Sequence, residues 1–447
     1  MPWRDLVRPS EMSRVALVAP AERLRKVLVA VGEAGLVELD AVESPGAESD
    51  VVVSFDPPAD TDADGPIGLG EAELRSIDEA AAHTKACSVI TGWARRADLD
   101  ELRAALEPVG AGVVELELPR HVLPPTSLPD QPSSRSLRPL VDTYAVVPYQ
   151  DLDPTWFAGI VYLLMFGAMF GDVGHGAALA LAGLGLRRSH RARLASLSRL
   201  GPFLVGAGMS AVVFGLLYGE AFGPTGLVPT LWIRPLDEPE TLLATGLMAG
   251  VVLLALTFAM AAVNRWREGG ARMAMFAATG VAGSALFAGV VVFAGGAVLS
   301  VGWMMWIGSA MAIVGAVLVF VGLLAGSGGG SGAVAEAIVE MFDVLIRLGS
   351  NLVSFTRLAA FGLTHAVITG VVWDGTVGLW DRGSALTAIE AVGLMVVGNV
   401  AAFALGALVG AIQALRLEYY ELFSRLFASE GRPFRPWRPR IERRTTE

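Results

Sequence analysis

An arginine, Arg357, stands inside an apolar stretch, residues 349–372, that is long enough as a helix to cross a bilayer. A charge at the centre of a membrane helix costs about 2.5 to 3.5 kcal/mol on insertion scales, so such a residue normally faces protein or water and has a function. The alternative is an arginine that snorkels from a helix end. Arg347 already occupies the polar end of this segment, about 15 Å earlier at the helical rise. Arg357 is therefore the first candidate functional residue.

Further polar side chains lie on the same segment and on the next one. Ser354 precedes Arg357, and His365 follows it by about 12 Å along a helix, rotated by about 80°. Arg416 lies on the last long apolar segment. Because histidine changes charge near neutral pH, His365 is a candidate lining group for a proton path. A histidine hydrogen-bonded to a neighbouring helix fits the pattern equally well.

Acidic residues precede and follow this positive charge. Glu340 and Asp343 lie before Arg347, and Glu390 opens the last apolar segment. Each alone is explained as a solvated charge at a helix end. As a set with Arg357, they suit two half-channels separated by a positive barrier. An arginine stays protonated, so it can attract a passing carboxylate and make it release its proton without carrying that proton itself.

The motif FGAMFGDVGHG, residues 166–176, predicts a tight turn between two helices. Gly171 and Gly174 permit a sharp reversal and close helix approach. Asp172 can cap the following helix, and we expect a structural role for His175 as well. A metal or proton-donor role for Asp172 and His175 is the weaker alternative.

Composition identifies a polytopic membrane protein. Of the 447 residues, 53% are hydrophobic, and mean hydropathy is +0.54. A lone cysteine, Cys87, excludes a disulfide framework and a cysteine metal cluster. Five scattered histidines argue against a histidine metal site. We expect no metal, no other cofactor and no nucleic-acid partner.

Eight apolar runs are predicted to span the bilayer. They cover residues 156–170, 173–187, 201–219, 241–263, 273–295, 300–325, 348–373 and 387–413. Arginines gather in alternate loops, at 187–199 and 265–272, and in the tail, whereas the loops at 220–240 and 374–386 hold almost none. The positive-inside rule then places both termini in the cytoplasm of a cell-membrane protein. The N-terminus lacks the apolar core of a secretory signal, and the chain starts at Met1 or Met12.

The first 118 residues predict a small cytoplasmic α+β domain. Two β-α-β patterns, with strands at 15–18, 37–39, 87–93 and 113–118, suggest a ferredoxin-like sheet, with a further helix at 71–83. We expect a proline-rich linker over 119–154, a helical transmembrane domain over 155–427 with its last two helices long and tilted, and a basic tail over 428–447. The glycine and serine run at 325–332 is predicted to be a flexible linker. It lacks the ending of a phosphate loop, so no nucleotide site is expected.

Six blocks in order resemble the membrane stator subunit of V-type and A-type rotary ATPases, called subunit a, subunit I or the 116 kDa subunit family. They are MSRVALVAPAERLRKVLVAVGEAGLVELD, TGWARRADLDELRAAL, DPTWFAGIVYLLMFGAMFGDVGHG, VFGLLYGEAFG, SFTRLAAFGLTHAVI and AIQALRLEYYELFSRLFASEGRPFRP. The resemblance implies a non-catalytic, proton-conducting subunit that faces a proteolipid rotor ring and contacts central-stalk and peripheral-stalk subunits. By the resemblance, Arg357 corresponds to the arginine that meets the rotor carboxylate, Arg416 to the arginine beside it, and His365 to the histidine toward the outer half-channel.

The chain departs from this family pattern in three places. The long arm and distal lobe of the soluble region are almost absent, which puts the usual stalk attachment in doubt. Gly406 stands where the family usually has an outer-channel glutamate, so Glu390, His365 or water would have to replace it. Glu418 stands where a histidine is common.

Two other functions remain open. A non-pumping scaffold relative would dock to a rotor ring or another membrane complex without coupled transport. A self-contained transporter would need inverted repeats, which are not visible in the sequence. The ion, proton or sodium, and the direction of operation are not fixed by the residues of this chain.

Overall fold

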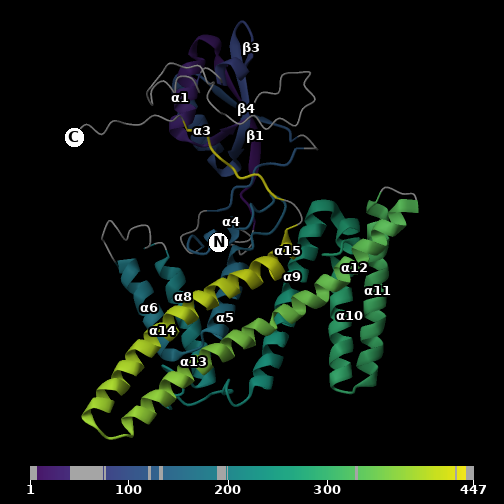
Figure 1. Cartoon of the computed structure of the whole chain (residues 1–447). Coiled ribbons are helices and arrows are strands. Elements are labelled where there is room, and N and C mark those ends of the chain that lie inside the picture. The colour runs from purple at the N-terminus through teal and green to yellow at the C-terminus, as the bar shows by residue number, and fades with distance from the viewer. Residues whose placement is uncertain are drawn as a thin grey trace, which may run out of the picture. The chain divides into compact units, whose positions relative to one another are not determined.

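The computed structural model describes residues 8–40, 74, 77–118, 122–129, 134–188, 198, 200–327, 331–427 and 430–438. The chain forms two compact units. One holds residues 1–129, 146–149 and 430–447, and the other holds residues 130–145 and 150–429. Figure 1 shows a sheet with helices in the first unit and long helices in the second.

The first unit contains an antiparallel sheet with the strand order β2-β4-β1-β5, and β3 pairs with β4. The strands are β1 (Met12–Pro20), β2 (Val37–Leu39), β3 (Ala82–His83), β4 (Cys87–Arg95) and β5 (Gly112–Leu116). Helices α1 (Leu24–Ala34) and α3 (Leu99–Leu106) bury their leucine and valine stripes in one core with the strands. Short 3₁₀ turns lie at Ala21–Arg23, Arg96–Asp98 and Glu107–Val109.

The order of these strands and helices follows the predicted pattern, and the ferredoxin-like class itself stays a prediction. Helix α1 ends at Gly35, whose φ of 60° is left-handed. The predicted helix over 71–83 was wrong at its end, because strand β3 begins at Ala82. Of its earlier part, residue 74 and residues 77–80 are described and helical.

The described part of the C-terminal tail belongs to the sheet unit. Arg432 forms an ion pair of 3.2 Å with Glu38, and the backbone N–H of Arg435 donates to the same carboxylate at 2.6 Å. The Trp437 N–H donates to the carbonyl oxygen of Val37 in edge strand β2, and its ring packs against the core. Residues 430–438 are thus not a separate tail, which differs from the predicted boundary at 428. The predicted linker also contains a short helix, α4 (Arg138–Asp142).

The second unit is a bundle of apolar helices. Its main helices are α5 (Thr155–Met169), α6 (Val173–Arg188), α8 (Gly201–Tyr218), α9 (Pro239–Phe276), α10 (Val281–Val298), α11 (Gly302–Gly326), α12 (Ser331–Ser354), α13 (Thr356–Trp380) and α14 (Ala385–Leu417). Among the described residues, six helical segments are long and apolar enough to cross a membrane, with α12 and α13 counted as one. Helix α5 is apolar but shorter, so the predicted number of eight spans stays unconfirmed.

Three predicted boundaries in this unit were wrong. Helix α9 runs beyond residue 263, is kinked by non-helical backbone at Gly269 and Gly270, and ends at Phe276, whereas α10 begins at Val281, so no single span covers 273–295. Helix α11 continues to Gly326 and α12 begins at Ser331, which leaves little of the predicted linker. Only residues 328–330 of that linker lie outside the described residues. Glycine and serine are therefore compatible with helix ends here.

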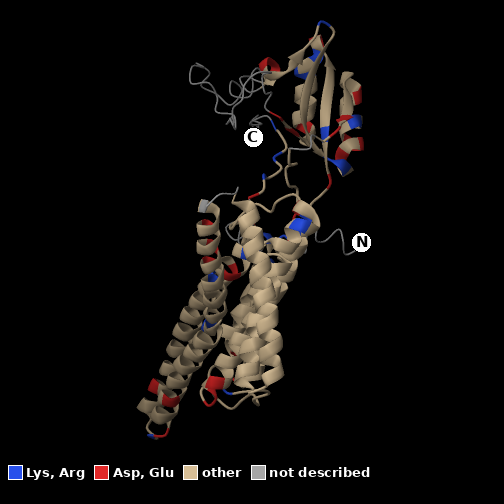
Figure 2. Ribbon diagram, turned by 90° about the vertical axis from the view of Figure 1, so that its right-hand side faces the viewer, with Lys and Arg blue, Asp and Glu red and all other residues tan. Residues whose placement is uncertain are grey.

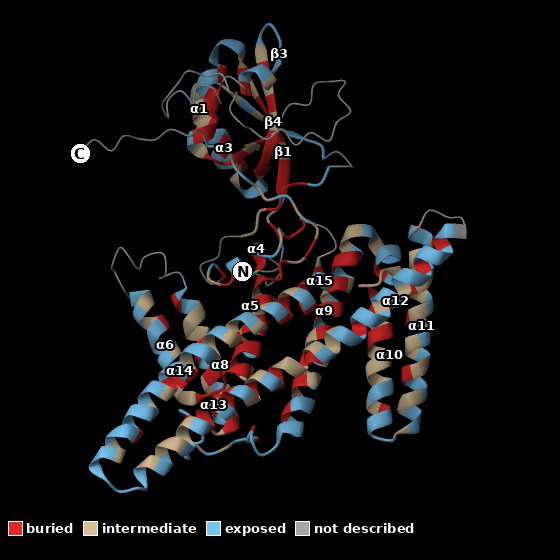
Figure 3. Ribbon diagram, in the orientation of Figure 1, coloured by how far each residue is buried: buried red, intermediate tan, exposed pale blue. Residues whose placement is uncertain are grey.

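The last helices form a long pair that runs side by side (Figure 1). Phe355 divides the predicted helix around Arg357 into α12 and α13, but its φ of −70° and ψ of −13° are helical, and the two helices form one candidate span, Gly332–Trp380. Helix α14 continues through a π-helical turn at Glu418–Phe423 into the short α15 (Ser424–Leu426). Charged residues concentrate toward helix ends and loops (Figure 2), and much of the surface of α13 and α14 is exposed (Figure 3). The exposed side chains of α14 are mainly aliphatic.

Candidate functional site

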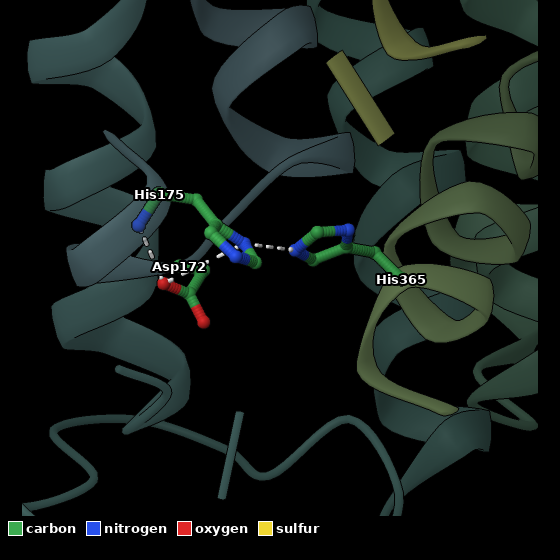
Figure 4. Close-up of side chains that lie close together, drawn as sticks. All are labelled: Asp172, His175 and His365. Atoms are coloured by element: carbon green, nitrogen blue, oxygen red, sulfur yellow. Dashed lines mark hydrogen bonds and ion pairs between the residues drawn. The ribbon is translucent and has the colours of Figure 1, made fainter. Parts of the chain in front are cut away.

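Asp172, His175 and His365 form a buried cluster between α6 and α13 (Figure 4). The exposed fractions of these residues are 0%, 2% and 4%. His175 Nδ1 lies 3.4 Å from His365 Nε2 and 3.9 Å from Asp172 Oδ1. Among the described residues, these three are the set of potential metal ligands whose donor atoms all lie within 4.8 Å of one another.

Asp172 holds the turn before α6 through three backbone hydrogen bonds. Its Oδ1 accepts from the N–H of His175 at 2.9 Å and of Phe222 at 3.0 Å, and its Oδ2 accepts from Gly223 at 2.8 Å. The bond to His175 is that of a helix N-cap. The other two fix the loop after α8, where Phe222 has a φ of 55°, a conformation that non-glycine residues seldom adopt.

Aromatic rings enclose the two histidines. The ring of Phe170 lies 5.8 Å from that of His175 and 4.9 Å from that of His365, and Phe222 and Phe403 cover His175 at 5.5 and 5.8 Å. Gly406 completes the wall, because a Cβ there would stand 2.6 Å from His365 Nδ1. In this arrangement His365 occupies the space that a side chain at position 406 would need.

Glu220 adds an acidic group beside this cluster that the sequence interpretation did not single out. It follows the end of α8, and 4% of the residue is exposed. Burial, together with the nearby charge of Asp172, raises the pKa of Glu220 to about 8. A signal was present in the sequence, since Glu220 lies directly after an apolar helix in one of the matched blocks.

Arg357 lies at the start of α13, next to the end of α14. Its side chain is 29% exposed, and its Nη1 lies 3.9 Å from the Oε1 of Glu421. Glu421 also interacts electrostatically with Arg416 and Arg425 and hydrogen-bonds with Ser354. The structure thus brings Arg357, Arg416 and Ser354 around one carboxylate that sequence reasoning missed.

Glu421 was overlooked because it lies beyond the apolar part of the last span. The π-helical turn widens the helix by one residue per turn, and Glu418 and Glu421 are both buried within it. Two glutamates in the short run EYYELF were the available signal. Glu418 has no hydrogen-bond partner for either carboxylate oxygen among the described residues.

The remaining predicted residues lie elsewhere. Glu390 is exposed in the second turn of α14, 26 residues before Arg416, so the structure does not bring it to Arg357. Asp343 pairs with Arg347 one helical turn away at 2.7 Å, as solvated helix charges do. Gly171 and Gly174 approach Tyr218 and Phe222 so closely that a Cβ at either position would overlap the ring.

Comparison with known proteins identifies relatives along most of the chain. Residues 77–226 match the model of the V-type ATPase 116kDa subunit family. The A-type ATP synthase subunit I of Archaeoglobus fulgidus is 24% identical over 401 residues, which cover 78% of this chain and 58% of that protein. The A-type ATP synthase subunit I of Halobacterium salinarum is 28% identical, and the match covers 65% of this chain and 48% of that protein.

A eukaryotic relative matches a shorter region. The V-type proton ATPase 116 kDa subunit a 2 of Bos taurus is 31% identical over 153 residues, which cover 31% of this chain and 18% of that protein. The chain spans about half the length of the archaeal relatives that it matches. Its apolar helices indicate a multi-pass membrane protein, and over these regions the chain is similar to the V-type ATPase 116 kDa subunit family and to the archaeal subunit I proteins.

Proposed function

We propose that this chain is the membrane stator of a V-type or A-type rotary ATPase and that it forms two ion half-channels against a ring of proteolipid subunits. Arg357 is the charge that separates them. The observation that carries the proposal is the setting of Arg357. Its side chain is 29% exposed on an apolar helix pair, and its Nη1 lies 3.9 Å from the Oε1 of Glu421.

The geometry around Arg357 suits an exchange of carboxylates. Its guanidinium Nη1 is buried without a hydrogen bond among the described residues, so its pairing with Glu421 is loose. A carboxylate on a passing rotor subunit could therefore approach the exposed side of Arg357 and lose its proton. Arg416 also interacts electrostatically with Glu421, which supports a role for both arginines at one site.

The exposed face of α14 suits a ring of apolar helices. Its outward side chains include Ile389 at 71% exposure, Val397 at 69% and Leu408 at 60%. In a bilayer such a face meets lipid or another apolar helix. We propose that part of it meets the rotor ring, with the stalk subunits attached through the cytoplasmic unit.

The outer half-channel would pass the buried histidine pair. His365 lies two helical turns beyond Arg357, and His175 and Asp172 lie next to it. The orientation that follows has both termini in the cytoplasm, with the loop of Glu220 on the outer side. Protons are the proposed ion.

The test is co-purification followed by transport. We expect the tagged chain to bring down a proteolipid ring in mild detergent, and reconstituted vesicles to acidify when ATP is added. Arg357→Ala should keep the ring and abolish acidification. Arg357→Lys should abolish most of the acidification, because lysine can lose its proton and lacks the planar guanidinium group of arginine. Arg234→Ala is the matched control, since Arg234 is 68% exposed in another loop. Pumping that is indifferent to Arg357 contradicts the stator proposal.

The alternative is a scaffold that docks to a ring without conducting ions. It is favoured by Gly406, which leaves no titratable side chain where the family resemblance implies one. The same experiment separates the two functions. A scaffold would co-purify with the ring, whereas the wild-type vesicles would not acidify.

A further inference from the structure

The facing nitrogens of His175 and His365 are placed as two ligands of one metal ion would be. They come from helices 190 residues apart in sequence and lie 3.4 Å from each other in a buried site. Two histidines bound to one tetrahedral zinc ion at 2.0 to 2.1 Å have their nitrogens about 3.3 Å apart. The observed separation needs almost no adjustment.

Asp172 supplies a third donor. Its Oδ1 lies 3.9 Å from His175 Nδ1, and the three donor atoms all lie within 4.8 Å of one another. The carboxylate already accepts three backbone N–H bonds, two at Oδ1 and one at Oδ2. These bonds fix its position and leave one of its roughly four lone-pair sites, on Oδ2, for a metal. A fourth position would be filled by water or another small ligand.

We propose that Asp172, His175 and His365 form a binding site for a divalent transition metal, with Zn²⁺ as the best match to two imidazoles and one carboxylate. Without metal, the two nitrogens share one hydrogen, so one is a donor and the other an acceptor. With metal, both must present lone pairs. The donor histidine therefore moves its proton to its other ring nitrogen, and no net proton is released.

The Oδ1 of Asn399, on α14, is placed to accept a hydrogen bond from a proton on His175 Nε2. His175 Nε2 and the Oδ1 of Asn399 are both buried without a hydrogen bond of full geometry among the described residues, although the two side chains lie close enough to interact. Metal-bound histidines usually donate their second N–H to such an oxygen, which fixes the ring. The metal-bound form would always carry a proton on His175 Nε2, whereas the metal-free form carries one there only when His365 is the donor to His175 Nδ1.

The metal would tie α6 to α13 within the membrane unit. This site does not depend on the proposed rotary function, since it rests on the ligand geometry alone. If the rotary function also holds, Zn²⁺ would block the outer path and inhibit transport.

The experiment measures metal binding directly on the full chain in detergent after chelation. We expect one Co²⁺ per chain with the visible absorption of a tetrahedral site, displaced by one Zn²⁺. His175→Gln and His365→Ala should each lower Zn²⁺ affinity at least a hundredfold. Asn399→Ala should lower it about 10- to 100-fold. His83→Ala is the control, because His83 lies in the sheet unit and its side chain is 46% exposed. It should leave the affinity unchanged.

Three results would overturn the site. They are absence of tetrahedral Co²⁺ absorption in the wild type, equal Zn²⁺ affinity in wild type and His365→Ala, and loss of binding in His83→Ala. Helical content by circular dichroism and a single elution peak show that each variant is folded. His175→Gln keeps a polar side chain in the pocket, so it tests the imidazole without opening a cavity.

Discussion

Asp172 is a fully buried carboxylate that joins two segments distant in sequence. It accepts N–H groups from the first turn of α6 and from the loop at Phe222 and Gly223. Such charge-assisted bonds to backbone donors are stronger than neutral ones. The same side chain places His175 and shapes the loop that holds Glu220, so its structural role and its place in the candidate site are inseparable.

Asp172→Asn should destabilise the membrane unit by about 1 to 3 kcal/mol. An amide keeps one oxygen but turns an NH₂ group toward one of the N–H donors, which leaves a buried donor unpaired. The measurement is the thermal midpoint in detergent. Asp237→Asn is the control, since Asp237 is 68% exposed, and it should leave the midpoint unchanged. Equal midpoints for both variants would show that the three hydrogen bonds contribute little.

Asp151 is a second buried carboxyl group, and it should make the stability of the folded state depend on pH. It precedes α5 and lies beside Glu268, and burial with that neighbour raises the pKa of Asp151 to about 8, while Arg265 opposes the shift. The folded state thus favours the protonated form. The protonated Asp151 carboxyl group therefore contributes fully to the stability of the folded state below the unfolded pKa near 4. This contribution is lost as the pH rises through the folded pKa of about 8.

Asp151→Asn should therefore be more stable than the wild type at pH 9 and similar to it at pH 4. Each unit of pKa shift corresponds to about 1.4 kcal/mol, so the gain at pH 9 can reach several kcal/mol. Thermal midpoints of both proteins across this pH range provide the measurement. A gain that is the same at every pH would exclude titration of Asp151 as its cause.

At the scale of elements, glycine decides how closely the helices approach. A Cβ on Gly208 of α8 would lie 2.5 Å from the backbone of Gly176 and Ala180 in α6, and Gly289 and Gly308 make similar approaches between α10 and α11. Within a bilayer, helix association depends on such packing. Composition alone could not say which glycines lie at these crossings.

Gly208→Ala should cost about 1 to 3 kcal/mol, because the added methyl group forces two backbones apart. Gly378→Ala is the matched variant. Gly378 also lies within a helix, α13, but has no atom within 4 Å of its ideal Cβ position. It should gain about 0.5 to 1 kcal/mol from helix propensity. A lower thermal midpoint for Gly208→Ala and a higher one for Gly378→Ala, both relative to the wild type, would support this difference. Lower midpoints in both variants would contradict it.

At the scale of the whole molecule, the two ends of the chain meet in one unit. The C-terminal segment from Glu430 runs onto edge strand β2 and covers part of the core with Trp437. An unpaired sheet edge is open to other chains, and a covering segment closes it. The burial of Glu38 raises the pKa of this carboxyl group, and the backbone N–H of Arg435 and the charge of Arg432 oppose that rise.

Truncation before Glu430 should destabilise the sheet unit and expose β2. We expect faster amide hydrogen exchange over Val37–Leu39 and cleavage by protease at lower concentration. Trp437→Ala should give a partial effect of about 1 to 2 kcal/mol from lost apolar contact. Arg432→Ala should cost less than about 1 kcal/mol, because this ion pair is half exposed. Unchanged exchange in β2 after truncation would mean that the tail does not stabilise the sheet.

The sequence by itself determined the class of protein and the two residues that stand out in it. Apolar runs of bilayer length and alternating strand patterns are local properties, so they predicted most of the helices and strands, although the ends of several helices, such as α9 and α10, were wrong. Arg357 and His365 were visible because a charged or titratable side chain is costly in an apolar helix.

Only the tertiary structure decided which distant residues meet. The contact of His175 with His365, the pairing of Arg357 with Glu421 and the return of the tail to β2 depend on how whole helices and strands pack. The scattered histidines looked unsuited to a metal for the same reason. Spacing along the chain carries no information about contacts across 190 residues, because side-chain shape and glycine positions at the crossings fix those contacts.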